Sequence, residues 1–219
     1  MNSSLSLFRL TAVLVACVGV LAGCFGIVAA GAGAGALMLT DRRISETYIA
    51  DEGIEMRAAK RIAEKYGEQV HINLTSYNRM LLMTGEVPNP SIKSDIERLV
   101  SGVPNVKSIG NELAIDGPSN FGSRSNDSYI TSKVKARFVD SNKFSANHVK
   151  VVTEAGVVFL LGMVTAEEAK AAVEIARTTG GVLKVVRVFE SITPEQAREL
   201  DSKPPLIQQT QFADPPAAK

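Results

Sequence analysis

The side chains best suited to chemistry in this 219-residue chain are two cysteines and two histidines. Cys17 lies inside an apolar run, so Cys24 is the thiol whose surroundings point to a reaction, and the two form no Cys-x-x-Cys zinc motif. His71 and His148 occupy matching places in two strand-like segments, and no further metal ligand has a suitable spacing. We therefore interpret both histidines as structural and expect no metal site. The sequence shows no credible Ser/His/Asp or Cys/His grouping, so we expect neither catalytic residues nor enzymatic activity.

The N-terminal segment of residues 1–23 is typical of an export signal. Arg9 supplies the positive charge that precedes an apolar stretch over residues 10–20. The next residues, Leu21-Ala22-Gly23-Cys24, resemble the bacterial lipobox, in which small residues allow cleavage directly before a cysteine. We expect the mature chain to start at Cys24, with diacylglycerol on its thiol and an acyl chain such as palmitate on its amine. Several acyl chains anchor a protein firmly, since each buried methylene contributes about 0.8 kcal/mol.

A transmembrane anchor over residues 10–39 is the alternative, because that length permits a membrane span. Its second half is a poor helix, since it contains four glycines within residues 26–35. In lipoproteins of Gram-negative bacteria, aspartate after the lipidated cysteine implies retention in the inner membrane. Here that residue is Phe25, which favours the outer membrane and its periplasmic face.

Charge and composition limit the classes of partner. The chain has 24 basic and 23 acidic residues, and residues 1–23 contain Arg9 but no acid, so the mature chain is balanced. A protein that binds nucleic acid through its overall charge is therefore excluded, and we expect no nucleic-acid partner. A hydrophobic content of 45% suffices for one or two small domains with their own cores.

The mature chain contains an internal repeat with the element order α-β-β-α-β. Gly85 and Gly162 lie 77 positions apart, as do the two histidines, and both glycines are expected to permit a bend or close packing. We predict an α+β fold in which each copy forms a three-stranded sheet with two helices on one face. The predicted segments are a flexible tether (24–45), the first copy (46–115), a flexible linker (116–126), the second copy (127–192), and a short helix with a disordered tail (193–219).

Capping residues mark the starts of three predicted helices. Asn89 precedes Pro90, which is the order of an N-cap followed by the first helical residue. Thr165 lies three residues before Glu168 and predicts a capping box. Thr193 precedes the short C-terminal helix, which we expect to extend to about residue 200.

The repeat resembles the BON domain, named for bacterial OsmY and nodulation proteins. The second copy carries the resemblance in residues 129–135, 149–154, 157–165 and 181–185, and the first copy keeps Gly85 and residues 102–106. A lipobox with two BON domains is similar to outer-membrane lipoproteins tied to envelope integrity and the division site. The resemblance implies a non-enzymatic protein without a cofactor beyond its acyl chains. It also implies binding of anionic phospholipid, such as phosphatidylglycerol or cardiolipin, through the first helix of the second copy.

The first helix of the second copy has the residue types that such binding requires. Its charges sum to +2, whereas those of the first copy's helix cancel. A stripe of one aromatic and two basic residues borders an apolar face, an arrangement suited to a lipid headgroup boundary. These candidate lipid-binding residues are Tyr129, Ile130, Lys133, Val134, Arg137 and Phe138.

Two alternatives to lipid binding remain open. The stripe could be a solvated helix face, with Tyr129 packed over the edge of the core. The protein could also be a periplasmic interaction module that assists the outer-membrane assembly machinery. In that case the exposed strand edges or the C-terminal tail would contact the partner.

Overall fold

The computed structural model describes residues 41–117 and 119–202. The predicted signal peptide, Cys24, most of the tether and the tail beyond residue 202 lie outside the described residues. Both copies of the repeat belong to one compact unit of the chain. In the part of the chain that the structure describes, none of the helices combines the length and apolar character that a membrane crossing requires.

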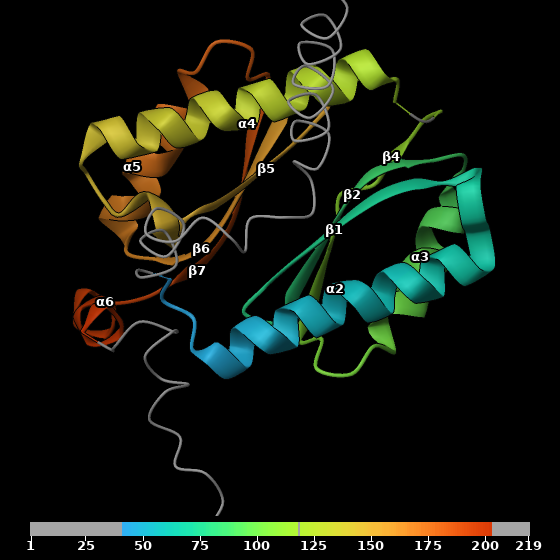
Figure 1. The fold of residues 1–219 in the computed structure, drawn as a ribbon, viewed down its shortest axis with the longest axis horizontal. Helices are drawn as coiled ribbons and strands as arrows, with labels where there is room; N and C mark the ends of the chain where they lie inside the picture. Colours follow the sequence, from blue (N-terminus) through green and yellow to red (C-terminus); the bar gives the residue numbers. More distant parts are fainter. Residues whose placement is uncertain (1–40, 118, 203–219) are drawn as a thin grey trace, which may run out of the picture. The chain divides into compact units, whose positions relative to one another are not determined.

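The first copy folds as a sheet covered on one face by two helices (Figure 1). Strand β2 lies in the centre, antiparallel to β1 and parallel to β3 and β4. Ile54, Ala58 and Ile62 place the first helix on the core, as the spacing predicts. The elements are α2 (Ser45–Tyr66), the 3₁₀ turn η2 (Gly67–Gln69), β1 (His71–Tyr77), β2 (Met80–Val87), α3 (Pro90–Ser101), β3 (Ser108–Asn111) and β4 (Ala114–Ile115).

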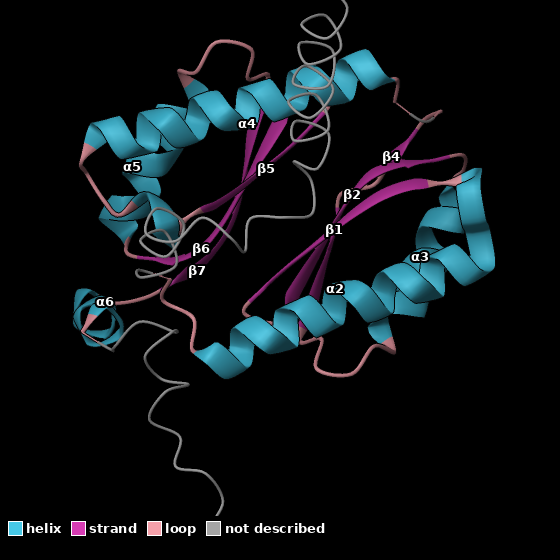
Figure 2. Ribbon diagram, in the orientation of Figure 1, coloured by secondary structure: helices cyan, strands magenta, loops and turns pink. Residues whose placement is uncertain are grey.

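The second copy repeats this arrangement and adds a short final helix (Figure 2). Strand β6 lies between antiparallel β5 and parallel β7. The elements are α4 (Phe121–Ser141), the 3₁₀ turn η3 (Ala146–His148), β5 (Lys150–Glu154), β6 (Val157–Val164), α5 (Ala166–Arg177), β7 (Lys184–Ser191) and α6 (Pro194–Asp201). The predicted α+β fold with two αββαβ copies is confirmed.

The predicted caps are present. The side chain of Asn89 accepts a hydrogen bond from the backbone N–H of Ile92 at 2.9 Å, and Pro90 is the first residue of α3. Thr165 and Glu168 form the capping box of α5. A second capping box at Thr193 begins α6. These helix starts depend on residues within one turn of each other, which is why sequence spacing predicts them.

The edge of the first sheet differs from the predicted continuous strand. Two short strands, β3 and β4, replace it, so this sheet has four strands rather than three. The interruption falls at Glu112 and Leu113, where the side chain of Leu113 is buried against the helices. In the second copy, β7 continues through the equivalent region.

The faces of the two sheets that carry no helix share a third core cluster. Tyr77 and Leu82 of the first copy are buried together with Phe159 and Leu161 of the second. Leu82 and Phe159 lie 77 positions apart and are therefore equivalent in the repeat. The two copies are joined through apolar side chains as well as through the chain itself.

A buried aspartate in the first helix of each copy binds the hairpin turn between the first two strands. In the first copy, the carboxylate of Asp51 accepts the backbone N–H groups of Asn78 at 2.9 Å and Arg79 at 2.7 Å. In the second, Asp127 accepts those of Ala155 at 2.9 Å and Gly156 at 2.8 Å.

The four turn residues have positive φ, between 48° and 75°, as a two-residue type I′ hairpin requires. Three of them are not glycine, so each turn holds backbone strain, on the order of 1 kcal/mol for each such residue. The charge-assisted hydrogen bonds of the aspartates offset this strain. Asp51 is 1% exposed and Asp127 is 4% exposed, so water competes little for these bonds.

The predicted flexible linker over residues 116–126 is wrong for its second half. Helix α4 starts at Phe121, and the side chain of Asn120 caps it by accepting the N–H of Ser123 at 2.9 Å. Glycine and serine in this stretch have low helix propensity and predict a loop. The cap and the contacts of Asp127 stabilise the helix despite that composition.

The predicted flexible tether is wrong for residues 41–45. Arg42 is 4% exposed and binds the second copy, with hydrogen bonds to Glu168 at 2.7 Å, Asp201 at 2.8 Å and the carbonyl of Met163 at 2.8 Å. Arg43 is also buried, and its guanidinium lies 3.0 Å from Asp51. These partners are up to 159 positions away, so sequence spacing does not reveal them.

The Arg42 cluster shifts the titration of its neighbours. Burial would raise the pKa of Glu168, but hydrogen bonds from Arg42 and Thr165 outweigh burial and lower that pKa to about 2. Burial, followed by the positive charge of Arg42, lowers the pKa of His148 below its usual value. The folded state therefore favours ionised Glu168 and neutral His148.

We predict that Asp127→Ala lowers the free energy of unfolding by about 2–3 kcal/mol, because it leaves two turn N–H groups without their acceptor. Urea unfolding of the wild type and the variant measures this difference. Asp140→Ala, which removes an exposed carboxylate from the same helix, is the matched control. A loss for Asp127→Ala no larger than that of the control would contradict the role given to the buried aspartate.

We also predict that acid destabilises the second copy in two stages. In the unfolded chain His148 gains a proton near its ordinary pKa of 6.5, so stability begins to fall below that pH. The contribution of Glu168 is complete above pH 4.5 and is lost as the pH falls toward about 2.

Urea unfolding at pH 7, 5 and 3 measures both stages. Glu168→Gln should be less stable at pH 7 and should lose less stability between pH 5 and pH 3, by at most about 3 kcal/mol. Glu167→Gln changes the exposed neighbouring carboxylate and should follow the wild type. Identical pH profiles for Glu168→Gln and the wild type would refute the assignment.

Candidate functional site

Three of the six predicted lipid-binding residues belong to the core of the second copy. Ile130 is 1% exposed, and Val134 and Phe138 are fully buried against β5, β6 and α5. The apolar side of α4 faces its own sheet, so these side chains cannot reach a lipid while the domain is folded. The predicted site is corrected here to the three residues that border this face.

The two predicted cations bind the C-terminal end of α5. Arg137 donates to the carbonyl of Ile175 at 2.9 Å and to the hydroxyl of Thr179 at 2.8 Å. Lys133 donates to the carbonyl of Gly180. Carbonyls at the end of a helix lack partners within the helix, and cations satisfy both their hydrogen bonds and the helix dipole.

The first copy uses the same pair of contacts 76 positions earlier. Arg61 donates to the carbonyl of Leu99 at 3.2 Å, and Arg57 reaches the carbonyl of Pro104 at 3.5 Å. Both copies therefore carry this cation pair, although the net charges of their first helices differ. The pair has a structural role in both copies.

Exposed apolar groups distinguish the surface around Lys133. Tyr129 is 62% exposed, and Lys133 lies 4.5 Å from the centroid of its ring. Leu183 is 81% exposed and lies three positions after Gly180, whose carbonyl accepts a hydrogen bond from Lys133. We call this surface the Tyr129 patch and define it as Tyr129, Lys133 and Leu183.

Sequence reasoning missed Leu183, because it was assigned to the β-like run that closes the second copy. The structure places it before β7, which starts at Lys184. A large aliphatic residue next to two glycines is the only signal that the sequence offers.

Gly85 of β2 and Gly162 of β6 each leave room for the backbone carbonyl of a histidine to lie close to the strand. A Cβ at Gly85 would lie 2.1 Å from the carbonyl oxygen of His71, and one at Gly162 would lie 2.3 Å from that of His148. Gly85 also has a φ of 112°, which side chains rarely adopt. These positions serve strand pairing rather than a ligand.

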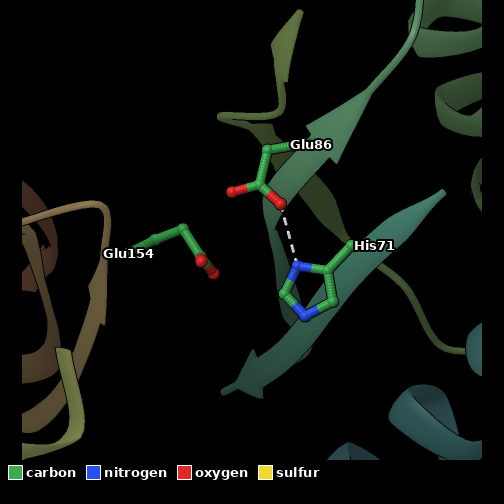
Figure 3. Close-up of side chains that lie close together, drawn as sticks. All are labelled: His71, Glu86 and Glu154. Carbon is green, nitrogen blue, oxygen red and sulfur yellow. Dashed lines mark hydrogen bonds and ion pairs between the residues drawn. The ribbon is translucent and has the colours of Figure 1, made fainter. Parts of the chain in front are cut away.

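His71 is not isolated, although the sequence provides no ligands near it. Its Nδ1 lies 2.9 Å from a carboxylate oxygen of Glu86 on the paired strand, and Glu154 of the second copy joins them (Figure 3). Sequence reasoning missed this group because Glu154 comes from the other copy. His148, in contrast, contacts Glu168 at 3.2 Å in the Arg42 cluster.

Comparison with known proteins agrees with the fold. The profile of the BON domain matches residues 50–117 and 126–191, which are the two copies described above. The chain therefore belongs to the BON domain family.

Two relatives match the chain over more than one BON domain. Outer membrane lipoprotein DolP of Haemophilus influenzae is 35% identical over 189 residues, which cover 85% of this chain and 98% of that protein. The 21 kDa hemolysin of Actinobacillus pleuropneumoniae is 34% identical over 154 residues, covering 69% of this chain and 79% of that protein. The similarity to DolP supports an outer-membrane lipoprotein that carries BON domains.

We predict that Arg137→Gln lowers the free energy of unfolding by about 1–2 kcal/mol, because the carbonyl of Ile175 loses a charged donor. Lys135→Gln removes an exposed cation from the same helix and should change stability by less than about 0.5 kcal/mol. Urea unfolding compares the two variants. Equal stability of both would show that Arg137 has no structural role.

Proposed function

We propose that this protein is a non-enzymatic outer-membrane lipoprotein whose second BON domain binds anionic phospholipid through the Tyr129 patch. The observation that carries the proposal is the exposure of Tyr129 beside Lys133, together with exposed Leu183 three positions after Gly180, which accepts a hydrogen bond from Lys133. Isolated apolar side chains on a surface are common, but an exposed aromatic residue beside a lysine, with an exposed aliphatic residue in the same domain, suits the boundary between headgroups and acyl chains.

The patch can contact a lipid without any change to the core. An ammonium group has three N–H donors, and the carbonyl of Gly180 accepts one from Lys133. Tyr129 and Leu183 can insert their exposed apolar atoms between headgroups, while Lys133 faces the phosphates. Arg137 has the structural role described above and is not needed as a lipid contact.

The expected affinity is low and matches a protein that is already attached to a membrane. Burying two large apolar side chains contributes about 3 kcal/mol, and each cation at an anionic surface adds about 1 kcal/mol. With Lys133 as the cation, the total corresponds to a Kd on the order of 1 mM. An anchor raises the effective concentration of the domain at the bilayer to about the millimolar range, so weak contacts are sufficient.

The proposal includes the anchor and the biological role. Diacylglycerol and an N-linked acyl chain on Cys24 would hold the protein on the periplasmic face of the outer membrane. Phosphatidylglycerol and cardiolipin are the proposed ligands. Support of envelope integrity, at the division site, rests on the BON resemblance together with the similarity to an outer membrane lipoprotein.

An interaction with protein is the second candidate function, and one observation favours it. Ile49 and Met56 of α2 are 68% and 72% exposed and lie seven positions apart, so they share one helix face. Such a face could dock on a component of the outer-membrane assembly machinery. This surface lies on the other BON domain, so variants can separate the two functions.

We predict that residues 41–202 bind phosphatidylglycerol micelles, with NMR shift changes in α4 and at residues 180–184. The double substitution Tyr129→Ser and Leu183→Ser should weaken binding at least tenfold, because it removes the apolar atoms that insert. Both side chains are exposed, so stability should change little. Titration with micelles of each variant measures the affinity.

Phe121→Ser is the matched control, because it removes an 83% exposed aromatic residue from the start of the same helix. Ile49→Ser with Met56→Ser changes the second candidate surface, on the other domain, and should leave micelle binding unchanged. Absence of shifts in the wild type, or equal loss of binding in the Phe121 control, would refute lipid binding through the Tyr129 patch.

A further inference from the structure

A histidine and two glutamates from three strands meet where the two BON domains contact each other. His71 lies on β1, Glu86 on β2 and Glu154 at the end of β5. One nitrogen or oxygen atom from each side chain lies within 4.8 Å of the other two. Figure 3 shows the carboxylate of Glu154 pointing toward the other two side chains from the second domain.

The two carboxylates are buried without a basic partner of their own. Glu86 is 7% exposed and Glu154 is 8% exposed. Within residues 41–117 and 119–202, no lysine or arginine forms an ion pair with either glutamate, and His71 is the partner of Glu86. Two buried carboxylates at this separation repel each other unless a proton or a cation lies between them.

Neighbouring groups hold both carboxylates in place. Glu86 accepts the backbone N–H of Ser119 at 3.1 Å. Glu154 accepts from the side-chain amide of Asn73 at 2.7 Å and from the hydroxyl of Thr84 at 3.3 Å. Partners of this kind orient the ligands of a metal and are a regular part of metal sites in proteins.

The repeat shows that the fold does not require these acids. The residue equivalent to Glu86 in the second copy is Met163, and the residue equivalent to Glu154 in the first copy is Tyr77, each at a separation of 77 positions. Tyr77 and Met163 belong to the apolar cluster between the sheets. In the equivalent contact between the domains, Glu86 of the first copy and Glu154 of the second take the places of Met163 and Tyr77. His71 lies beside these two acids.

We propose that His71, Glu86 and Glu154 bind one zinc ion, which links the two BON domains. One imidazole and two carboxylates are a ligand set that suits Zn²⁺, whereas Mg²⁺ and Ca²⁺ prefer oxygen ligands alone. This inference is independent of lipid binding, because the three residues lie outside the Tyr129 patch.

Small side-chain rotations complete the site. Ligand atoms of a tetrahedral zinc ion lie about 3.4 Å apart, given metal–ligand distances near 2.1 Å. The ion would replace the hydrogen bond between His71 and Glu86. His71, Asn73 and Glu154 line a cavity of about 460 Å³, which gives water access as a fourth ligand.

Calorimetric titration with zinc chloride tests the proposal on the full chain, purified in detergent and freed of metal with a chelator. We expect one zinc ion per chain in the wild type. Glu154→Gln and Glu86→Met should each weaken binding at least tenfold, because each removes one charged ligand. Glu86→Met introduces the residue that the second copy carries, so this variant is expected to fold. Glu112→Gln changes an exposed carboxylate near the edge of the first sheet and should bind like the wild type.

Thermal unfolding gives a second measurement that does not depend on calorimetry. Saturating zinc should raise the unfolding midpoint of the wild type and of Glu112→Gln, since the ion binds the folded state alone. At the same zinc concentration, the rise for Glu86→Met should be clearly smaller, because its affinity is at least tenfold lower. The proposal is overturned by the absence of zinc binding in the wild type, or by equal affinities of the wild type, Glu86→Met and Glu154→Gln.

Discussion

The rest of each BON domain depends on the contact between a buried aspartate of the first helix and the hairpin turn. Asp51 and Asp127 bind backbone N–H groups of residues whose left-handed conformation is unfavourable for residues other than glycine. This contact fixes the register of the hairpin relative to the helix. It thereby determines which side chains of the central strand face the helices and which face the other domain.

Equivalent positions in the two copies carry different residues at the solvent-exposed surface and at the contact between the two domains. The cation pair of the first helix binds the end of the second helix in both copies, so it cannot explain a function of the second copy alone. The second copy differs by the exposed Tyr129 and Leu183. The first copy differs by Glu86, which stands where the second has Met163. Residues that differ between the two copies are therefore the best candidates for a function that belongs to one copy.

Local signals predicted the fold, and distant contacts explain the errors. Asn89 and Thr165 cap their helices through atoms a few residues away, so their spacing is sufficient to place α3 and α5. Helix α4 starts earlier than its glycine and serine content predicts, because Asn120 and the anchored Asp127 stabilise it. The partners of Arg42 come from beyond the first copy, and Glu154 reaches His71 from the second copy. No periodicity in the sequence relates residues that only the packing of two domains brings together.

The buried position of Arg42 determines where a pulling force on the N-terminal segment would first act on the folded domains. The chain enters the folded unit at Asp41, and Arg42 is bound at once to β6, α5 and α6 of the second domain. Tension on the N-terminal segment, such as the proposed lipid anchor would transmit, would therefore load this cluster of ion pairs before it reaches α2. The two domains would share the force, because Arg43, one residue later, is paired with Asp51 of the first domain.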